Sequence, residues 1–194
     1  MTDDWKARFR ELYHTSQERY RAGRTTTTTI FEPDEVYFLA TIGCSSRELF
    51  DFVDDSINWD DVEYEQVEGV TELRRDHFVN TLRSEDATTQ LDPDKIPAKT
   101  DEVDGIAWLP RLIVKARAKL AGQLPPELMY GCGGDRPFLG EHNSNLVDFL
   151  RVTLESGDDD RVYDPSITPF NSGIALLVDT GGNDIYRIPV GANH

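Results

Sequence analysis

The segment WLPRLIVKARAKLAG, residues 108–122, most restricts what this chain of 194 residues can fold into. Its apolar side chains recur at the 3.6-residue period of an α-helix and form one face, made by Leu112, Ile113, Ala116 and Leu120. Pro110 suits the first turn, where its missing N–H removes no hydrogen bond, and Gly122 suits the end. The segment therefore predicts a helix with one face on the core.

Four more segments have a helical pattern. Residues 4–22 are followed by Gly23, and CSSRELFDFV begins with Ser45 and Glu48 at the spacing of a capping box. A longer helix is expected over residues 61–83. The last is SNLVDFLRVTLESG, residues 144–157, with Asn143 or Ser144 as its N-cap and Gly157 at its end. Together with 108–122 they predict about five helices.

Other segments favour β-structure. RTTTTTIF (24–31) and EVYFLATIG (35–43) are rich in β-branched and aromatic residues and are joined by EPDE, which predicts an N-terminal strand pair. IALLVDTGGNDIYRIPV, residues 174–190, predicts a C-terminal β-hairpin around two glycines. Residues 84–104 are polar and lack a period, so they predict a surface loop. The expected fold class is α+β, with a mainly helical core in a single domain over residues 1–194.

Charge and composition exclude several classes of protein. The chain has 20 basic and 36 acidic residues and a net charge of −16, which disfavours general binding to nucleic acid or anionic membranes. No apolar run approaches the roughly 20 residues of a membrane span, and the N-terminus lacks the pattern of a secretory signal. Two cysteines, Cys44 and Cys132, are too few for a disulfide framework. A cytoplasmic protein is expected.

Basic residues gather where acidic ones are absent. Residues 25–104 hold 21 acids and 6 bases, whereas residues 105–124 hold four bases and no acid. Arg111, Lys115 and Lys119 recur every four residues on one side of the expected helix. The two lysines are interpreted as a solvated face. Arg111 stands in the first turn, where the helix dipole disfavours a cation, so we expect it to have a carboxylate or a ligand as its acceptor.

Arg74 and His77 lie on the inward side of the helix expected over residues 61–83. A charged arginine on an apolar face requires a partner or a wet cleft. Two interpretations stay open: Arg74 pairs with an internal acid such as Asp51 or Asp54, or it binds a substrate carboxylate or phosphate. In the second case His77 would act as acid or base near neutral pH.

The segment MYGCGGDRPFLGEHN, residues 129–143, is the candidate loop. Gly133 and Gly134 allow a ligand close to backbone N–H groups, with Tyr130 and Arg136 beside them. Cys132 would be a nucleophile if its thiolate were favoured by nearby positive charge, and Asp135 would handle protons. The alternative is a sharp structural turn. Cys44 is interpreted as a buried small residue.

Metal and nucleotide sites are not expected. No two of the four histidines have helical ligand spacing, and the acidic clusters lack the spacing of a calcium loop. The phosphate-loop and dinucleotide glycine motifs are also absent from the sequence. We therefore expect a protein without a metal or a nucleotide cofactor.

Residues 36–160 resemble the uncharacterised bacterial family of small soluble proteins named DUF5069. The likeness is most specific at Leu109, Pro110 and Arg111 combined with Lys115, Ala116, Arg117, Ala118, Leu120, Ala121 and Gly122. It also includes ATIGCSSRELFDFVDD and YGCGGDRPFL. The resemblance implies a helical core and supplies no catalytic residues.

Two functional hypotheses follow. In the first, the protein binds a small anionic metabolite that carries a carboxylate or a phosphate. If the protein is an enzyme, it also transforms this metabolite. Arg74, Arg111 and Arg136 with Tyr130, Gly133 and Gly134 would bind it, and His77, Cys132 and Asp135 would be catalytic. In the second, the protein is a non-enzymatic interaction protein. It would form a homodimer or bind a partner through its N-terminal aromatic helix and its C-terminal hairpin.

Overall fold

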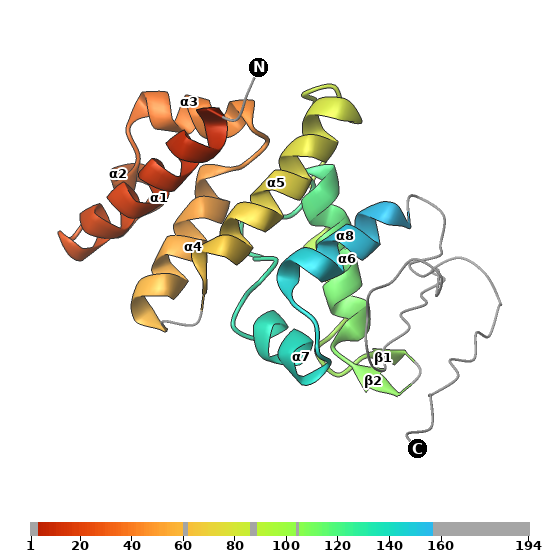
Figure 1. The fold of residues 1–194 in the computed structure, drawn as a ribbon. Coiled ribbons are helices and arrows are strands. Elements are labelled where there is room, and N and C mark those ends of the chain that lie inside the picture. The colour runs from red at the N-terminus through yellow and green to blue at the C-terminus, as the bar shows by residue number, and fades with distance from the viewer. Residues whose placement is uncertain (1–3, 60–61, 86–88, 104, 157–194) are drawn as a thin grey trace.

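The computed structural model describes residues 4–59, 62–85, 89–103 and 105–156, and these residues are mostly helical. Figure 1 shows the eight α-helices of this part of the chain: α1 (Asp4–Arg21), α2 (Thr27–Ile30), α3 (Pro33–Thr41), α4 (Ser46–Asn58), α5 (Tyr64–Asn80), α6 (Leu109–Ala121), α7 (Asp135–Glu141) and α8 (Leu146–Glu155). A 3-10 helix, η1 (Pro93–Lys95), precedes the antiparallel strands β1 (Glu102–Val103) and β2 (Ile106–Ala107), in which Val103 pairs with Ile106.

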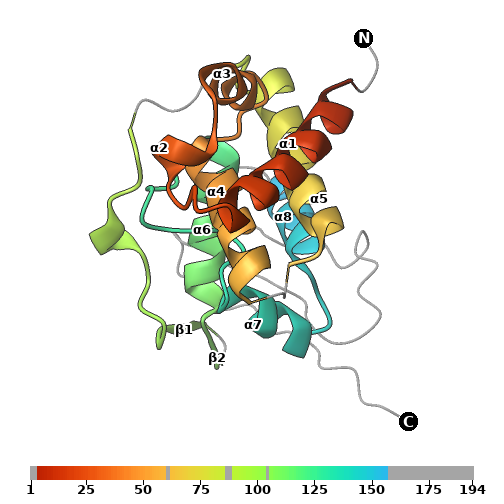
Figure 2. The same ribbon diagram turned by 90° about the vertical axis from the view of Figure 1, so that its left-hand side faces the viewer.

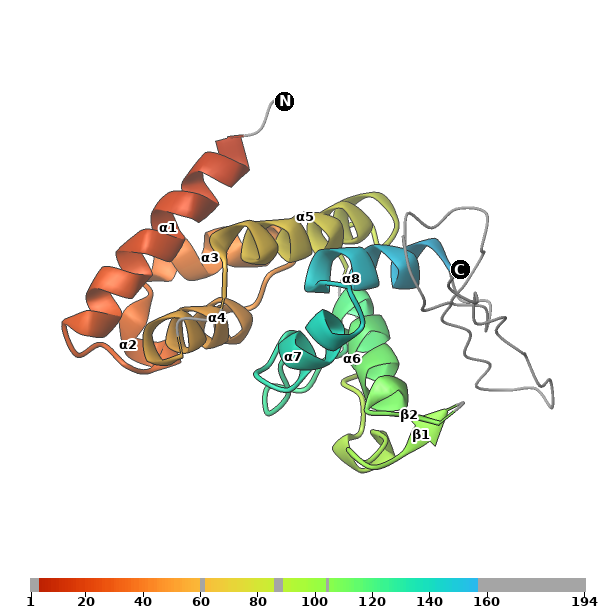
Figure 3. The same ribbon diagram turned by 60° about the horizontal axis from the view of Figure 1, so that its bottom comes forward.

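The helices pack in two connected groups. In the first, α4 lies against α1, α2 and α3, and Figure 2 shows α1 crossing in front of α4. In the second, α5, α6 and α8 pack against one another, and α7 contacts α8. Helix α5 also contacts α1, and Figure 3 shows it extending from the first group over α6 and α8. The long helix α5 therefore joins the two groups.

One hydrophobic core runs through both groups. Its fully buried side chains include Phe9 of α1, Leu49 and Val53 of α4, Val67 and Val70 of α5, Leu112, Ile113 and Ala116 of α6, and Leu146 and Leu150 of α8. The apolar face predicted for residues 108–122 is therefore confirmed. Helix α6 ends at Gly122, whose φ of +69° is a left-handed conformation that glycine adopts without strain.

The five predicted helices are confirmed as α1, α4, α5, α6 and α8. The capping box at α4 is also present, because Ser45 Oγ accepts from the N–H of Glu48 at 3.2 Å while Glu48 accepts from the N–H of Ser45 at 2.8 Å. The predicted N-cap of α8 is wrong by one or two residues. Asn145, not Asn143 or Ser144, caps this helix by accepting from the N–H of Asp148. Gly157 lies outside the described residues.

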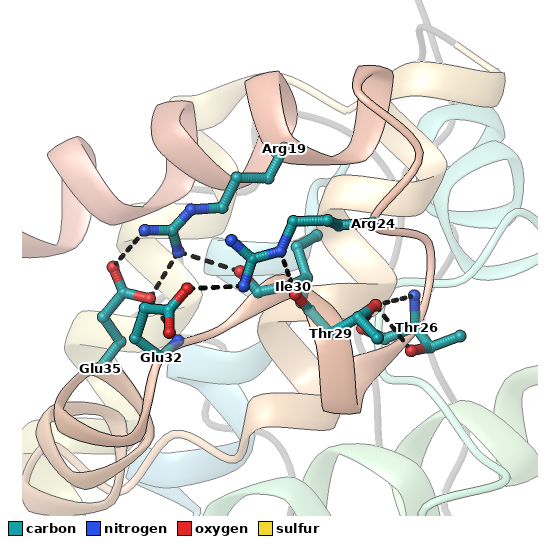
Figure 4. A network of polar contacts seen from close by, with 7 residues as sticks. All are labelled: Arg19, Arg24, Thr26, Thr29, Ile30, Glu32 and Glu35. Carbon is teal, nitrogen blue, oxygen red and sulfur yellow. Dashed lines mark hydrogen bonds and ion pairs between the residues drawn. The ribbon is translucent and has the colours of Figure 1, made fainter.

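The N-terminal strand pair is wrong, because residues 24–43 form α2 and α3. Figure 4 shows the side chains that hold this segment. Arg19 of α1 donates to both carboxylate oxygens of Glu35, at 2.6 and 3.1 Å, and to the carbonyl of Ile30 at 2.9 Å. Arg24 pairs with Glu32 at 2.7 Å and donates to the carbonyl of Thr29. These contacts fix two short helices against α1.

Local capping outweighs the β-propensity of this segment. Thr29 Oγ1 accepts from the N–H of Thr26 at 3.3 Å, so threonine side chains satisfy the first turn of α2. Pro33 occupies the first turn of α3, and Glu35 accepts from the N–H of Glu32 at 2.7 Å. The EPDE sequence is therefore a helix start with a proline and acids in its first turn, not a hairpin turn.

The predicted α+β class is corrected to a mostly helical fold. Its one described sheet is the pair β1 and β2, which begins inside the predicted loop 84–104 and turns at Gly105. The hairpin predicted for residues 174–190 lies outside the described residues. Helix α7 was not predicted, since its segment was interpreted as a loop. Among the described helices, none has the length and apolarity needed to cross a membrane.

Candidate functional site

One cavity among the described residues lies where three helices end. We name it the Arg117 cavity; its volume is about 670 Å³, within the range of ligand sites in proteins. It is lined by the C-terminal parts of α5, α6 and α8, by η1 and by the segment before it, through His77, Thr81, Leu91, Lys95, Val114, Arg117, Ala118, Leu120, Ala121, Gln123, Thr153 and Leu154. A hydrogen bond of 2.8 Å from Leu91 N–H to the Gln123 carbonyl ties that segment to the end of α6.

Arg117 is the unusual residue of this cavity. It lies on α6 with Val114, Ala118 and Ala121, at spacings that place all four on one side of the helix. Its Nε and Nη2 atoms are buried, and neither has a hydrogen-bond partner among the residues that the structure describes. Because a guanidinium stays charged and a buried unpaired donor is costly, the position favours an anionic acceptor.

The other charged groups of the Arg117 cavity have the same sign. Lys95 adds a second cation, and His77 adds an imidazole. No aspartate or glutamate occurs among the described residues that line the cavity. On a chain with a net charge of −16, this is a local concentration of positive charge.

In the second cavity, which we name the Arg74 cavity, acidic side chains of the protein balance the basic ones. It has a volume of about 280 Å³ and includes Arg74, Lys119, Glu48 and Asp51. Lys119 Nζ is 2.6 Å from Glu48 Oε1, and both atoms come from largely buried side chains. Burial acts to raise the pKa of Glu48, but Lys119, the N–H of Ser45 and Arg74 together outweigh it, so that the pKa is lowered. The lysine charge is therefore already matched.

Arg74 and Asp51 contribute to the same internal balance. Arg74 is only 2% exposed, lies 5.0 Å from the ring centre of Phe78, and also acts to lower the pKa of Glu48. Burial raises the pKa of Asp51 to about 6, although Arg47 pairs with this carboxylate at 2.9 Å and opposes the shift. One of the two open interpretations paired Arg74 with an internal acid such as Asp51 or Asp54. The acid whose pKa Arg74 lowers is Glu48.

Tyr130, predicted to bind substrate, lines the Arg74 cavity but is 2% exposed. Its hydroxyl donates to the carbonyl of Leu146 at 2.7 Å, and burial raises its pKa well above the ordinary value. This tyrosine therefore joins the turn before Cys132 to the start of α8.

Asp135 occupies the place where an anionic ligand was expected. Its Oδ2 accepts from the N–H groups of Gly131 and Cys132, at 2.8 and 3.3 Å, and from Lys115 Nζ at 2.5 Å. Trp108 Nε1 donates to Oδ1 at 3.0 Å. The carboxylate is fully buried, and its four donors satisfy it. The Gly-Cys-Gly-Gly turn thus binds a carboxylate of its own chain.

Cys132 lies beside this pair, with its Sγ 3.4 Å from Lys115 Nζ. The same Lys115 ammonium is closer to the carboxylate of Asp135, at 2.5 Å. Its charge is therefore balanced mainly by Asp135 and not by the thiol. Cys44 is buried, as predicted, and burial raises its pKa to about 12. Among the described residues, no group of three or more potential metal ligands occurs.

Two glycines of the turn are required by close packing. A Cβ atom at Gly134 would come within 2.3 Å of Trp108 Cζ2, so only glycine lets the indole reach Asp135. Gly131 has a φ of +91°, and a Cβ there would lie 2.8 Å from Leu146. Gly133, in contrast, has Arg136 Nη2 at 3.9 Å as its nearest neighbour. These glycines favour the structural-turn alternative.

The other predicted arginines contact the protein. Arg136 pairs with Asp55 of α4 at 2.9 Å and also donates to the Gly131 carbonyl. Arg111 donates to the carbonyl of Pro97 at 2.8 Å, a backbone acceptor in place of the carboxylate or ligand expected for it. Neither arginine lines either cavity.

The predicted residues therefore separate into several places. Arg74 and Tyr130 line one cavity, His77 lines the other, and Cys132, Asp135 and Gly134 belong to the turn. The interpretation of Lys115 and Lys119 as solvated is wrong, because they are 2% and 3% exposed. Arg117 was missed; the signal for it was the acid-free basic segment 105–124.

Part of the aromatic face of the N-terminal helix packs in the core. Phe9 and Tyr13 are 0% and 2% exposed and belong to the core. Trp5 and Tyr20 of the same helix are only partly buried, and the C-terminal hairpin lies outside the described residues, so the interaction-protein hypothesis stays a prediction.

Comparisons of the chain with protein-family models, with curated proteins and with solved structures give no significant match. Membership of the family DUF5069 therefore stays a prediction, and the functional argument depends on the geometry alone.

Proposed function

We propose that this protein binds a small anionic molecule in the Arg117 cavity. The observation that carries the proposal is the guanidinium of Arg117, two of whose nitrogen atoms are buried without a partner among the described residues. An acceptor with a negative charge would satisfy both donors and would offset the cost of burying them.

The surroundings of Arg117 support the same function. Lys95 and His77 add positive or ionisable groups to the cavity, and no described acid lines it to compete with a ligand. The Arg74 cavity is the weaker candidate, because Glu48 already pairs with Lys119 there. The turn at Cys132 is weaker still, since Asp135 accepts its N–H groups.

The proposal is a binding function and includes no reaction. It retains the anionic ligand and His77 from the first hypothesis. It places neither Cys132 nor Asp135 at the ligand, because neither residue lines the Arg117 cavity.

Ligand-induced stabilisation tests the proposal. Sodium phosphate, acetate, butanoate and octanoate would be added at constant ionic strength while the melting temperature is measured. A ligand that binds only the folded protein at 100 times its Kd stabilises it by about 2.7 kcal/mol. We expect at least one anion to raise the melting temperature of the wild type and to lose this effect with Arg117→Met.

Arg151→Met is the matched control, because Arg151 is an exposed arginine of α8 whose partner is the exposed Asp148. This variant should respond to the anions as the wild type does. Equal responses of all three proteins, or no response in any of them, would contradict the proposal.

A further inference from the structure

We infer that the ligand of the Arg117 cavity is an amphipathic monocarboxylate, with its carboxylate on Arg117 and an aliphatic or aromatic body inside the cavity. The inference depends on the proposed function and adds the chemical class of the ligand.

The orientation of the two partnerless donors indicates the head group. Nε and Nη2 are the two nitrogen atoms of Arg117 that are buried without a hydrogen-bond partner among the described residues. These atoms lie on the same edge of the planar guanidinium, so their N–H bonds run parallel and match the two oxygens of one carboxylate. Phosphate oxygens fit the same fork, and the rest of the cavity must decide between the two groups.

The walls of the cavity indicate the body of the ligand. Beyond the charged groups, the lining is largely aliphatic, with Leu91, Val114, Leu120 and Leu154 among its residues. The volume of about 670 Å³ corresponds to roughly twenty water molecules at about 30 Å³ each. Inorganic phosphate or acetate would fill little of this space and would leave the aliphatic side chains without contacts, whereas an apolar chain would cover them.

The surrounding electrostatics favour a single negative charge. The cavity lies at the C-terminal ends of α5, α6 and α8, where helix dipoles place partial negative charge. Such ends disfavour anions and help to explain the cations gathered there. Lys95 is exposed, and within the described lining the buried donors without a partner are those of Arg117. A single guanidinium with two buried donors balances a monoanion better than a doubly charged phosphate.

A series of straight-chain carboxylates tests the inference by titration calorimetry. Kd would be measured for butanoate, hexanoate and octanoate, and for sodium phosphate as the anion without an apolar body. Each buried methylene contributes about 0.8 kcal/mol, which is about a fourfold change in affinity. We therefore expect octanoate to bind up to about 200-fold more tightly than butanoate, and phosphate to bind more weakly than octanoate.

Three variants make the result specific. Arg117→Met should abolish binding of every carboxylate, and Arg117→Lys, which keeps the charge but not the fork, should retain a weaker part of it. Ala121→Phe fills the cavity from the side of α6, so it should weaken octanoate at least tenfold while changing butanoate little. The melting temperature of each variant, measured without ligand, identifies any that fails to fold.

The outcomes separate the inference from the function that it depends on. Affinity that rises with chain length and requires Arg117 supports both. Phosphate binding that requires Arg117, with no gain along the carboxylate series, overturns the inference and leaves the proposed function in place. Binding that Arg117→Met and Arg117→Lys do not alter, or no binding of any probe, overturns both.

Discussion

At the scale of single residues, Lys115 and Asp135 hold the turn around Cys132. Both are almost completely buried, their charged atoms are 2.5 Å apart, and Asp135 also accepts from two backbone N–H groups and an indole. Removing one charge of such a pair leaves the other unpaired in the interior. This ion pair is therefore expected to contribute strongly to stability once it is formed.

The first prediction concerns this pair. Asp135→Asn keeps the size of the side chain but leaves the Lys115 ammonium without its counter-charge, so we expect a loss of about 3–5 kcal/mol in the free energy of unfolding. Urea denaturation at pH 7 measures this loss. Asp76→Asn is the control, because Asp76 forms a more exposed pair with Arg75 and its removal should cost about 1 kcal/mol or less. Equal losses in the two variants would contradict the role given to Asp135.

The second prediction concerns two glycines at opposite ends of α7. Gly134→Ala would place a Cβ atom 2.3 Å from the Trp108 ring, so we expect a loss of about 1–3 kcal/mol from overpacking. Gly140→Ala adds a Cβ atom where nothing lies within 4 Å, and should be neutral or stabilise by up to about 1 kcal/mol. Thermal unfolding of both variants checks the difference, which would be absent if the indole could move aside freely.

Residue patterns predicted burial better than they predicted partners. Arg74 was expected on the inward face of its helix and is buried, as that pattern indicated. Lys115 and Lys119 lie opposite the apolar face of α6, yet other parts of the protein cover that side as well. Periodicity shows which side chains of a helix share a face, but not what packs on the opposite face. The carboxylates that meet these lysines come from distant parts of the chain, Glu48 being 71 residues from Lys119.

At the scale of elements, local hydrogen bonding decided the N-terminal segment. Threonine and aromatic residues favour strands only where a neighbouring strand can pair with them. Here residues 24–43 are fixed instead by Arg19 and Arg24, which contact carbonyl and carboxylate oxygens of α2 and α3. The proline and acids at the start of α3 were a readable helix signal, whereas the two arginine contacts depend on the tertiary fold.

The third prediction is the pH dependence of the contact between α1 and α3. Burial acts to raise the pKa of Glu35, but the hydrogen bonds from Arg19 and from the Glu32 N–H outweigh it, so the pKa lies below its ordinary value of 4.5. An acid whose pKa is lowered by folding contributes stability above its unfolded pKa, and this contribution is lost as the pH falls through the folded pKa. Glu35→Gln should therefore be less stable than the wild type at pH 7, with the difference closing below about pH 4.5.

Urea denaturation between pH 7 and pH 3 measures this difference. Glu11→Gln, at an exposed position of α1, is the control and should stay close to the wild type throughout. A difference between Glu35→Gln and the wild type that is constant over this range would show that Glu35 acts through its shape and not through its charge.

At the scale of the whole molecule, the uneven charge of the sequence is partly balanced inside the fold. The basic segment 105–124 forms α6, which packs against α5 and α8. Lys119 of α6 meets Glu48 of α4, and Lys115 meets Asp135. Arg117 is the base of α6 whose buried nitrogen atoms have no partner among the described residues, which is why it marks the proposed ligand cavity. The chain as a whole still carries a net charge of −16.

The fourth prediction follows from this excess of negative charge. Self-repulsion destabilises a compact chain with a large net charge, and salt screens it over a Debye length that falls from about 30 Å at 0.01 M to about 8 Å at 0.15 M. The ion pairs that salt would weaken are mostly on the surface and contribute little. We therefore expect the melting temperature to rise by about 2–4 °C between 10 and 150 mM sodium chloride, which corresponds to about 1 kcal/mol.

Two controls separate screening from specific ion binding in this measurement. Tetramethylammonium chloride should give the same rise as sodium chloride, because screening does not depend on the identity of the cation. Chloride bound at Arg117 would add its own stabilisation, and Arg117→Met removes this possible site. If screening alone causes the rise, this variant should show the full rise. A melting temperature that falls with salt would mean that attractive ion pairs, such as Arg19 with Glu35, outweigh the repulsion among the acids.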